Sequence, residues 1–146
     1  MRRCARMLAG LTAIVLCAGP ALLPVAAAAF SDEDRAAGRA VIERQIEAFR
    51  RDDGAAAFAF ASPALREIFR DPEHFMAMVR NGYRPVYRPK SFSFDSITDT
   101  EIGLTARLSI EDAEGRTWTA IYTLEKQADG SWKITSCRLV EAGVSA

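Results

Sequence analysis

Apolar and polar residues alternate most regularly between Ile102 and Leu139. Ile102 to Ile110 follows a strict period of two, and Thr117 to Lys126 is rich in β-branched and aromatic residues. Both features are typical of half-buried strands. A further apolar stretch ends at Leu139. The segment therefore predicts a three-stranded antiparallel meander with two hairpin turns.

The length of the first hairpin loop determines how its strands pair. A three-residue loop at 113–115, with Gly115 in the left-handed conformation, places Ile110 opposite Trp118 and Ala106 opposite Tyr122. A two-residue loop would turn the two apolar sets to opposite faces, because a shift of one residue reverses a strand. We therefore predict the three-residue loop.

Asp129-Gly130 is the strongest short hairpin signal in the chain. A tight turn there places Tyr122 opposite Cys137 and Leu124 opposite Thr135. The inner face then carries the larger apolar side chains Trp118, Tyr122, Leu124, Cys137 and Leu139. The outer face carries Ile121, Trp132 and Ile134 among polar residues, which is more apolar than a solvated face requires. We expect a homodimer through these three residues.

The residues before the meander predict helices. Ser31 and the acidic residues after it are typical of a helix start, and Ile42, Ile46 and Phe49 form one apolar stripe. Gly54 suits the left-handed position that ends this helix. Ser62-Pro63 and Asp71-Pro72 predict two further helix starts, and Asn81-Gly82 ends the second.

Tyr83 to Pro89 is predicted to be an edge strand or an extended connector, because its two prolines disfavour a helix and remove hydrogen-bond donors. Ser91 to Ile97, with Phe92 and Phe94 alternating, predicts the first strand of the sheet. The chain is therefore expected to have an α+β fold, with N-terminal helices packed on a curved antiparallel sheet.

Residues 1–29 resemble a secretory signal peptide. Arg2, Arg3 and Arg6 precede an apolar run, and the small-residue tract 25–29 suits a cleavage site. The alternative is an uncleaved membrane anchor, which the interruptions at Pro20 and Pro24 disfavour. We expect cleavage, a periplasmic or secreted location, and no membrane contact afterwards.

Removal of residues 1–29 leaves one domain, 30–146. It keeps all 19 acidic residues and 16 of the 19 basic ones, so its formal charge is −3. This charge argues against a nucleic-acid partner. Cys137 is the only cysteine left, so an internal disulfide is excluded.

The order of helices and sheet resembles the cone-shaped fold of nuclear transport factor two, ketosteroid isomerase and the SnoaL-like cyclases. The residues that carry this resemblance are Asp53-Gly54 at the end of the long helix and the Asp-Gly-x-Trp-x-Ile pattern of 129–134. The resemblance implies a pocket between helices and sheet, and often dimerisation through the outer face of the sheet.

The chain is more closely similar to a bacterial exported family called domain of unknown function forty-eight sixty-four. The similarity runs from about Ala40 to Leu139 and implies no activity. It rests on short motifs at Ile46–Phe49, Phe58–Pro63, Phe75–Val79, Tyr83, Pro85–Pro89, Trp118–Ala120 and Gly130–Trp132.

The predicted pocket has a floor of Trp118, Tyr122, Thr135 and Cys137, covered by the helices and by residues 83–88. Aromatic-lined hollows with a few polar groups are the usual sites of small ligands. The alternative is that these side chains simply fill the core of a small domain.

Four residues, Tyr83, Arg84, Tyr87 and Arg88, could form an aromatic and cationic lip that binds a carboxylate or a phosphate. The alternative is that the prolines and charges of this segment only discourage strand pairing. Both interpretations remain open at this point.

An isomerase or dehydratase would need an acid or base in the pocket. In the predicted register no Asp or Glu of the meander faces inward, His74 lies in the exposed first turn of a helix, and Cys137 has no evident base or metal partner. We therefore predict no catalytic residue, no metal and no cofactor.

The leading hypothesis is an exported domain that binds a small apolar or amphipathic molecule or serves as a protein-interaction module. The alternative is a cofactor-independent enzyme acting on a small organic substrate through a pocket Tyr, Arg or Cys.

Overall fold

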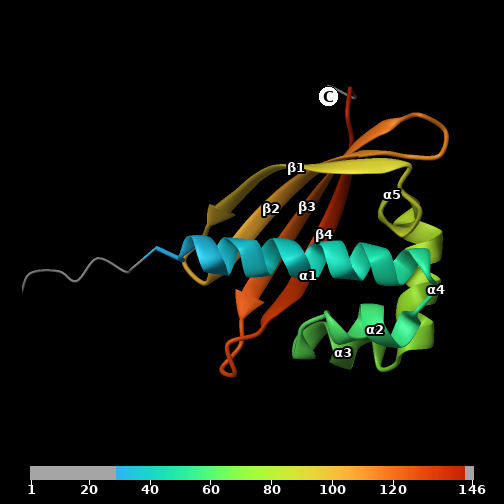
Figure 1. Ribbon diagram of the computed structural model, residues 1–146. Coiled ribbons are helices and arrows are strands. Elements are labelled where there is room, and N and C mark those ends of the chain that lie inside the picture. The colour runs from blue at the N-terminus through green and yellow to red at the C-terminus, as the bar shows by residue number, and fades with distance from the viewer. Residues whose placement is uncertain (1–28, 144–146) are drawn as a thin grey trace, which may run out of the picture.

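The computed structural model describes residues 29–143 and has helices on one face of a four-stranded antiparallel sheet of order β1-β2-β3-β4 (Figure 1). This confirms the α+β prediction. Within the described residues, no helix is long and apolar enough to cross a membrane. The elements are α1 (Asp32–Arg50), α2 (Gly54–Ala59), α3 (Pro63–Phe69), α4 (Pro72–Gly82), α5 (Arg84–Tyr87), β1 (Ser91–Asp99), β2 (Gly103–Glu111), β3 (Thr117–Lys126) and β4 (Trp132–Glu141). The predicted signal peptide lies almost entirely outside these residues.

Helix α1 lies across the sheet, and α2 to α5 gather around its C-terminal half (Figure 1). As predicted, Ser31 begins it: the Ser31 hydroxyl accepts from the Asp34 N–H at 3.1 Å, and the Asp34 carboxylate accepts from the Ser31 N–H at 3.2 Å. The stripe of Ile42, Ile46 and Phe49 is buried against the sheet. Burial of each such side chain contributes about 1.5–3 kcal/mol.

The predicted end of α1 is wrong in detail. The left-handed residue is Asp52, with φ of 53°, and Gly54 instead begins α2, which the Asp53 side chain caps. Gly54 serves close packing, because a Cβ there would lie 2.9 Å from Met76 Cγ of α4. Asp52 tolerates its conformation because its carboxylate is bound by side chains from α4 and α5 and the residue after α5.

The predicted N-terminal caps of α3 and α4 are confirmed. The Ser62 hydroxyl accepts from the Leu65 N–H at 3.3 Å, and the Asp71 carboxylate accepts from the His74 N–H at 2.9 Å. A proline occupies the first turn of each helix.

The prediction of an extended segment at 83–89 is wrong, because residues 84–87 form the single-turn helix α5. Pro85 lies in its first turn, where no N–H is needed. The N–H groups of Tyr87 and Arg88 donate to the carbonyls of Tyr83 and Arg84 at 3.0 and 2.9 Å. A proline excludes helix only beyond its first turn, and this helix ends before Pro89.

The first hairpin has the predicted register. Ile110 pairs with Trp118 and Ala106 with Tyr122, and Gly115 has a φ of 79°. In the second hairpin, the pairing of Tyr122 with Cys137 is also confirmed.

Nearer its turn, the second hairpin departs from the prediction. The Gln127 N–H donates to the Ser131 carbonyl at 2.7 Å, so the loop has three residues, and Leu124 pairs with Ile134. Thr135 is an extra residue in β4 that has no pairing partner on β3, which makes it a β-bulge. On its far side the pairing returns to the predicted register, with Thr123 opposite Ser136. The prediction that Leu124 pairs with Thr135 is therefore wrong.

The bulge turns Trp132 and Ile134 inward, and each is only 3% exposed. Their predicted place on the outer face is wrong. The Trp132 ring lies 5.2 Å from the ring of Phe30, and its Nε1 donates to Asp34 Oδ1 at 3.3 Å. Of the three predicted interface residues, only Ile121 remains on the outer face.

Candidate functional site

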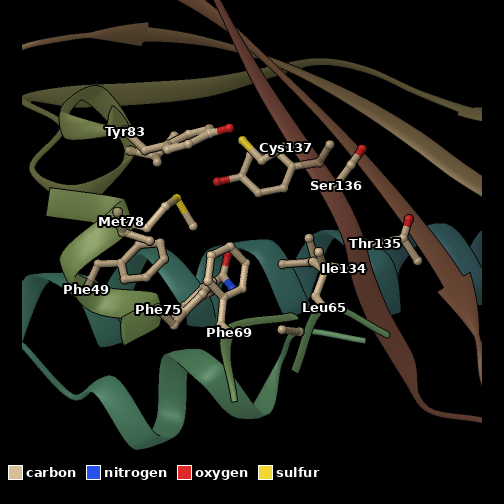
Figure 2. A pocket seen from close by; sticks show the side chains of 15 residues that line it. Phe49, Leu65, Phe69, Phe75, Met78, Tyr83, Ile134, Thr135, Ser136 and Cys137 are labelled. Carbon is tan, nitrogen blue, oxygen red and sulfur yellow. The ribbon is translucent and has the colours of Figure 1, made fainter. Parts of the chain in front are cut away.

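A pocket of about 340 Å³ lies between the helices and the inner face of β3 and β4 (Figure 2). Helices α1, α3, α4 and α5 form its roof and walls, and strands β3 and β4 form its floor. Its fifteen lining residues are all uncharged and mostly apolar. They are Gln45, Phe49, Ala61, Leu65, Phe69, Phe75, Met78, Val79, Tyr83, Val86, Tyr122, Ile134, Thr135, Ser136 and Cys137.

The pocket exists because α3 covers the sheet only loosely. No residue of α3 is fully buried, and its two residues that line the pocket, Leu65 and Phe69, are half-buried. Met78 of α4 and Tyr83 after it are also half-buried. These side chains form a rim of movable apolar groups opposite the edge strand β4.

The floor contains Tyr122, which is 1% exposed and whose hydroxyl has no hydrogen-bond partner among the described residues. Burial raises the pKa of Tyr122 well above its usual value, and the neighbouring Cys137 adds to this effect. Burial also raises the pKa of the Cys137 thiol to about 12. Both groups therefore stay protonated near neutral pH, so Cys137 is a poor nucleophile.

Two other polar side chains of the pocket, Gln45 and Thr135, already have partners. The Gln45 amide donates to the Ala57 carbonyl at 3.1 Å, which fastens α1 to α2. The Thr135 hydroxyl lies 2.7 Å from the Thr123 hydroxyl.

Four of the predicted pocket residues line this cavity: Tyr83, Tyr122, Thr135 and Cys137. Trp118 does not. Its Nε1 donates to the buried Asp112 carboxylate at 2.8 Å, at the far end of the first hairpin. Trp118 therefore anchors a loop and is not part of the pocket floor.

Tyr87 and Arg88 do not line this cavity either. Arg88 Nη2 donates to Asp52 Oδ2 at 2.7 Å, the Tyr87 hydroxyl donates to Asp52 Oδ1, and the Arg88 guanidinium lies 4.1 Å from the Tyr87 ring centroid. The hydrogen bond from Tyr87, followed by the charge of Arg88, lowers the pKa of Asp52. Tyr87 and Arg88 therefore fasten the end of α1 to α5, and the anion-binding lip stays a prediction.

Sequence reasoning missed several lining residues. Phe49, Phe69 and Met78 have the same helical spacing as core residues, so no pattern distinguishes them. Gln45 did leave a signal: it is a buried polar residue within the apolar stripe of Ile42 and Ile46.

Other candidate chemistry lies outside the pocket or is not assembled. His74 Nδ1 lies 2.7 Å from Asp71 Oδ2 on the exposed start of α4. Between residues 29 and 143, no group of three or more His, Cys, Asp or Glu side chains is placed to hold a metal ion.

Solved structures with a similar fold include two described as NTF2-like proteins of unknown function. One, from Shewanella baltica OS155, has a TM-score of 0.52 and 15% identity, with 75% of this chain and 96% of that chain covered. The other, from Silicibacter pomeroyi DSS-3, has a TM-score of 0.50 and 18% identity, with 77% and 99% covered. These likenesses support the predicted NTF2-like fold.

None of the curated proteins compared with the chain matches it. The model of one protein family matches residues 31–145, which is nearly all of the domain and includes every pocket residue. The chain therefore belongs to the family described as "Domain of unknown function (DUF4864)".

Proposed function

We propose that this domain binds a small, uncharged and largely apolar molecule in the pocket, without converting it chemically. The observation that carries the proposal is the pocket of about 340 Å³ whose fifteen lining residues include no charged side chain. Its volume lies near the lower end of the range for small-molecule sites, about 300–1,000 Å³.

The chemistry of the floor favours binding over catalysis. A general acid or base works best when its pKa lies near the working pH. The pKa values of Tyr122 and Cys137 are both raised away from neutrality. The lining residues also include no carboxylate or histidine that could pair with them.

We also propose that residues 1–29 direct export, on the basis of the three arginines and the apolar run in that segment. The ligand would then be a molecule that the domain meets outside the cytoplasm.

The test is a fluorescence titration with the neutral, apolar dye N-phenyl-1-naphthylamine on protein purified after export in a bacterial host. We expect saturable binding that Met78→Trp weakens by at least about tenfold, because the indole fills the pocket, a loss of about 1.4 kcal/mol. Ala77→Trp places the same indole on the exposed neighbouring position of α4. It should bind the dye as the unmodified protein does.

Circular dichroism and thermal unfolding of both variants establish that they are folded. Equal binding by the two variants, or no saturable binding by the unmodified protein, would contradict the proposal. Native mass spectrometry of the unmodified protein additionally detects any ligand that copurifies.

A further inference from the structure

The Tyr122 hydroxyl is a buried hydrogen-bond donor in the pocket that a ligand atom could satisfy. It is a polar group on the floor that is shielded from solvent and has no hydrogen-bond partner among residues 29–143. Leaving such a group unpaired in a protein interior is unfavourable, so it is seldom retained without a role.

The strands on either side of Tyr122 supply no strong partner. Tyr122 pairs across the sheet with Ala106 on β2 and with Cys137 on β4. Ala106 offers only a methyl group, and the sulfur of Cys137 is a weak hydrogen-bond acceptor. The phenol therefore has at most the weak interaction with the Cys137 sulfur and no strong acceptor in the described part of the chain.

Tyr122 lines the pocket from β3, so a ligand bound in the pocket approaches it from the helical side. Figure 2 shows Tyr83 and Met78 on that side, and Cys137 on β4, directed into the same part of the pocket. Met78 is half-buried, and its unbranched side chain adapts readily to a neighbouring group. Met78 and Tyr122 line the same pocket, so Met78 can adjust to a ligand there without any change in the sheet.

We propose that the ligand carries one uncharged carbonyl oxygen, as in a ketone or an ester, which accepts a hydrogen bond from the Tyr122 hydroxyl while its apolar body fills the pocket. This inference rests on the proposed binding function. A carboxylate is disfavoured at the same place, because no lining residue carries a positive charge to pair with it.

Three probes of nearly equal size test the proposal: 2-acetylnaphthalene, 2-isopropylnaphthalene and 2-naphthoate. Their affinities are measured by competition with N-phenyl-1-naphthylamine, on the unmodified protein and on Tyr122→Phe. We expect Tyr122→Phe to weaken the ketone about two- to tenfold, which is the effect of one neutral hydrogen bond. The hydrocarbon should change by less than about twofold, and the carboxylate should bind at least about tenfold more weakly than the ketone.

A second measurement needs no variant. The infrared carbonyl band of bound, ¹³C-labelled 2-acetylnaphthalene should lie at lower wavenumber than in hexane, because the carbonyl accepts a hydrogen bond. An unshifted band, or equal effects of Tyr122→Phe on ketone and hydrocarbon, would overturn the inference. Tight binding of 2-naphthoate would overturn the exclusion of carboxylates.

The failure of the underlying proposal has a different signature. If neither the dye nor any of the three probes binds, the pocket does not bind ligands of this size, and the proposed function itself is wrong. If the hydrocarbon binds and Tyr122→Phe leaves the affinity for the ketone unchanged, only the inference about the carbonyl is wrong.

Discussion

Asp34 joins three parts of the chain through one carboxylate. It accepts hydrogen bonds from Lys126 Nζ at 2.8 Å, from Trp132 Nε1 at 3.3 Å and from the Ser31 N–H at 3.2 Å. The hydrogen bond from Lys126 and that from Ser31 are the largest causes that lower the pKa of Asp34 from 3.8 to about 2. The start of α1 is thereby fastened to the second hairpin.

This pKa predicts an acid-sensitive contribution to stability. Because the pKa is lower in the folded protein, the contribution is complete above about pH 4 and is lost as the pH falls toward 2. We expect Asp34→Asn to be less stable than the unmodified protein at pH 6, with the difference shrinking between pH 4 and pH 2. Urea unfolding at several pH values measures it.

Glu33→Gln is the matched control, because it removes an exposed acidic residue from the same turn of α1. Subtracting its effect removes the general influence of charge at the helix start. A difference between Asp34→Asn and this control that stays constant from pH 6 to pH 2 would contradict the assignment.

Among the elements, the start of β2 leaves the least space for a side chain. Gly103 pairs with Glu125, and a Cβ on Gly103 would lie only 1.9 Å from the Leu124 carbonyl oxygen. That oxygen belongs to the backbone of the adjacent strand, so it cannot move without disturbing the pairing of β2 with β3.

We therefore expect Gly103→Ala to lower the free energy of unfolding by about 2–4 kcal/mol. Gly82→Ala is the matched control: a Cβ there meets nothing within 4 Å, and alanine favours the helix in which Gly82 lies. Denaturant unfolding should show the control to be at least as stable as the unmodified protein. Equal effects of the two substitutions would show that the strands do not approach so closely.

For the whole molecule, the bulge changes which surface is available for association. The outer face near its centre carries Ile121 between Arg107 and Arg138, while Trp132 and Ile134 belong to the core. Dimerisation through this face stays a prediction, and Ile121 is the one originally proposed interface residue that it can still use.

Trp132→Ala should consequently act on folding. We expect it to lower the free energy of unfolding by about 3–5 kcal/mol, because it leaves a cavity beneath α1. Ile121→Ala, on the half-buried outer face, should cost less than about 1 kcal/mol. Denaturant unfolding separates the two variants, and analytical ultracentrifugation of Ile121→Ala tests the dimer. A stable Trp132→Ala would contradict the core position.

Local chemistry made much of the fold predictable. The caps at Ser31, Ser62 and Asp71 and the left-handed Gly115 each act within a few residues, so sequence alone was sufficient to place them. The second loop was not determined in this way, because Asp129-Gly130 fits both a two-residue and a three-residue turn. Only the packing of Trp132 against α1 distinguishes the two.

The candidate site was predictable where it follows from strand pairing. The predicted pairing of Tyr122 with Cys137 puts both residues on the inner face, and it holds because this pair lies beyond the bulge, away from the turn. Tyr87 and Arg88 were misassigned because their partner, Asp52, lies 36 residues before Arg88 and is brought near only by the packing of α1 on α5. No sequence pattern indicates that α3 packs loosely on the sheet and so leaves the pocket open.

The β-bulge at Thr135 also affects where the second hairpin, formed by β3 and β4, can lose a residue. If Thr135 were deleted, Ile134 would still lie opposite Leu124 and Ser136 opposite Thr123, so every side chain would keep its face. Loss of Thr135 would therefore reshape the floor of the pocket and leave the core residues of both strands in place.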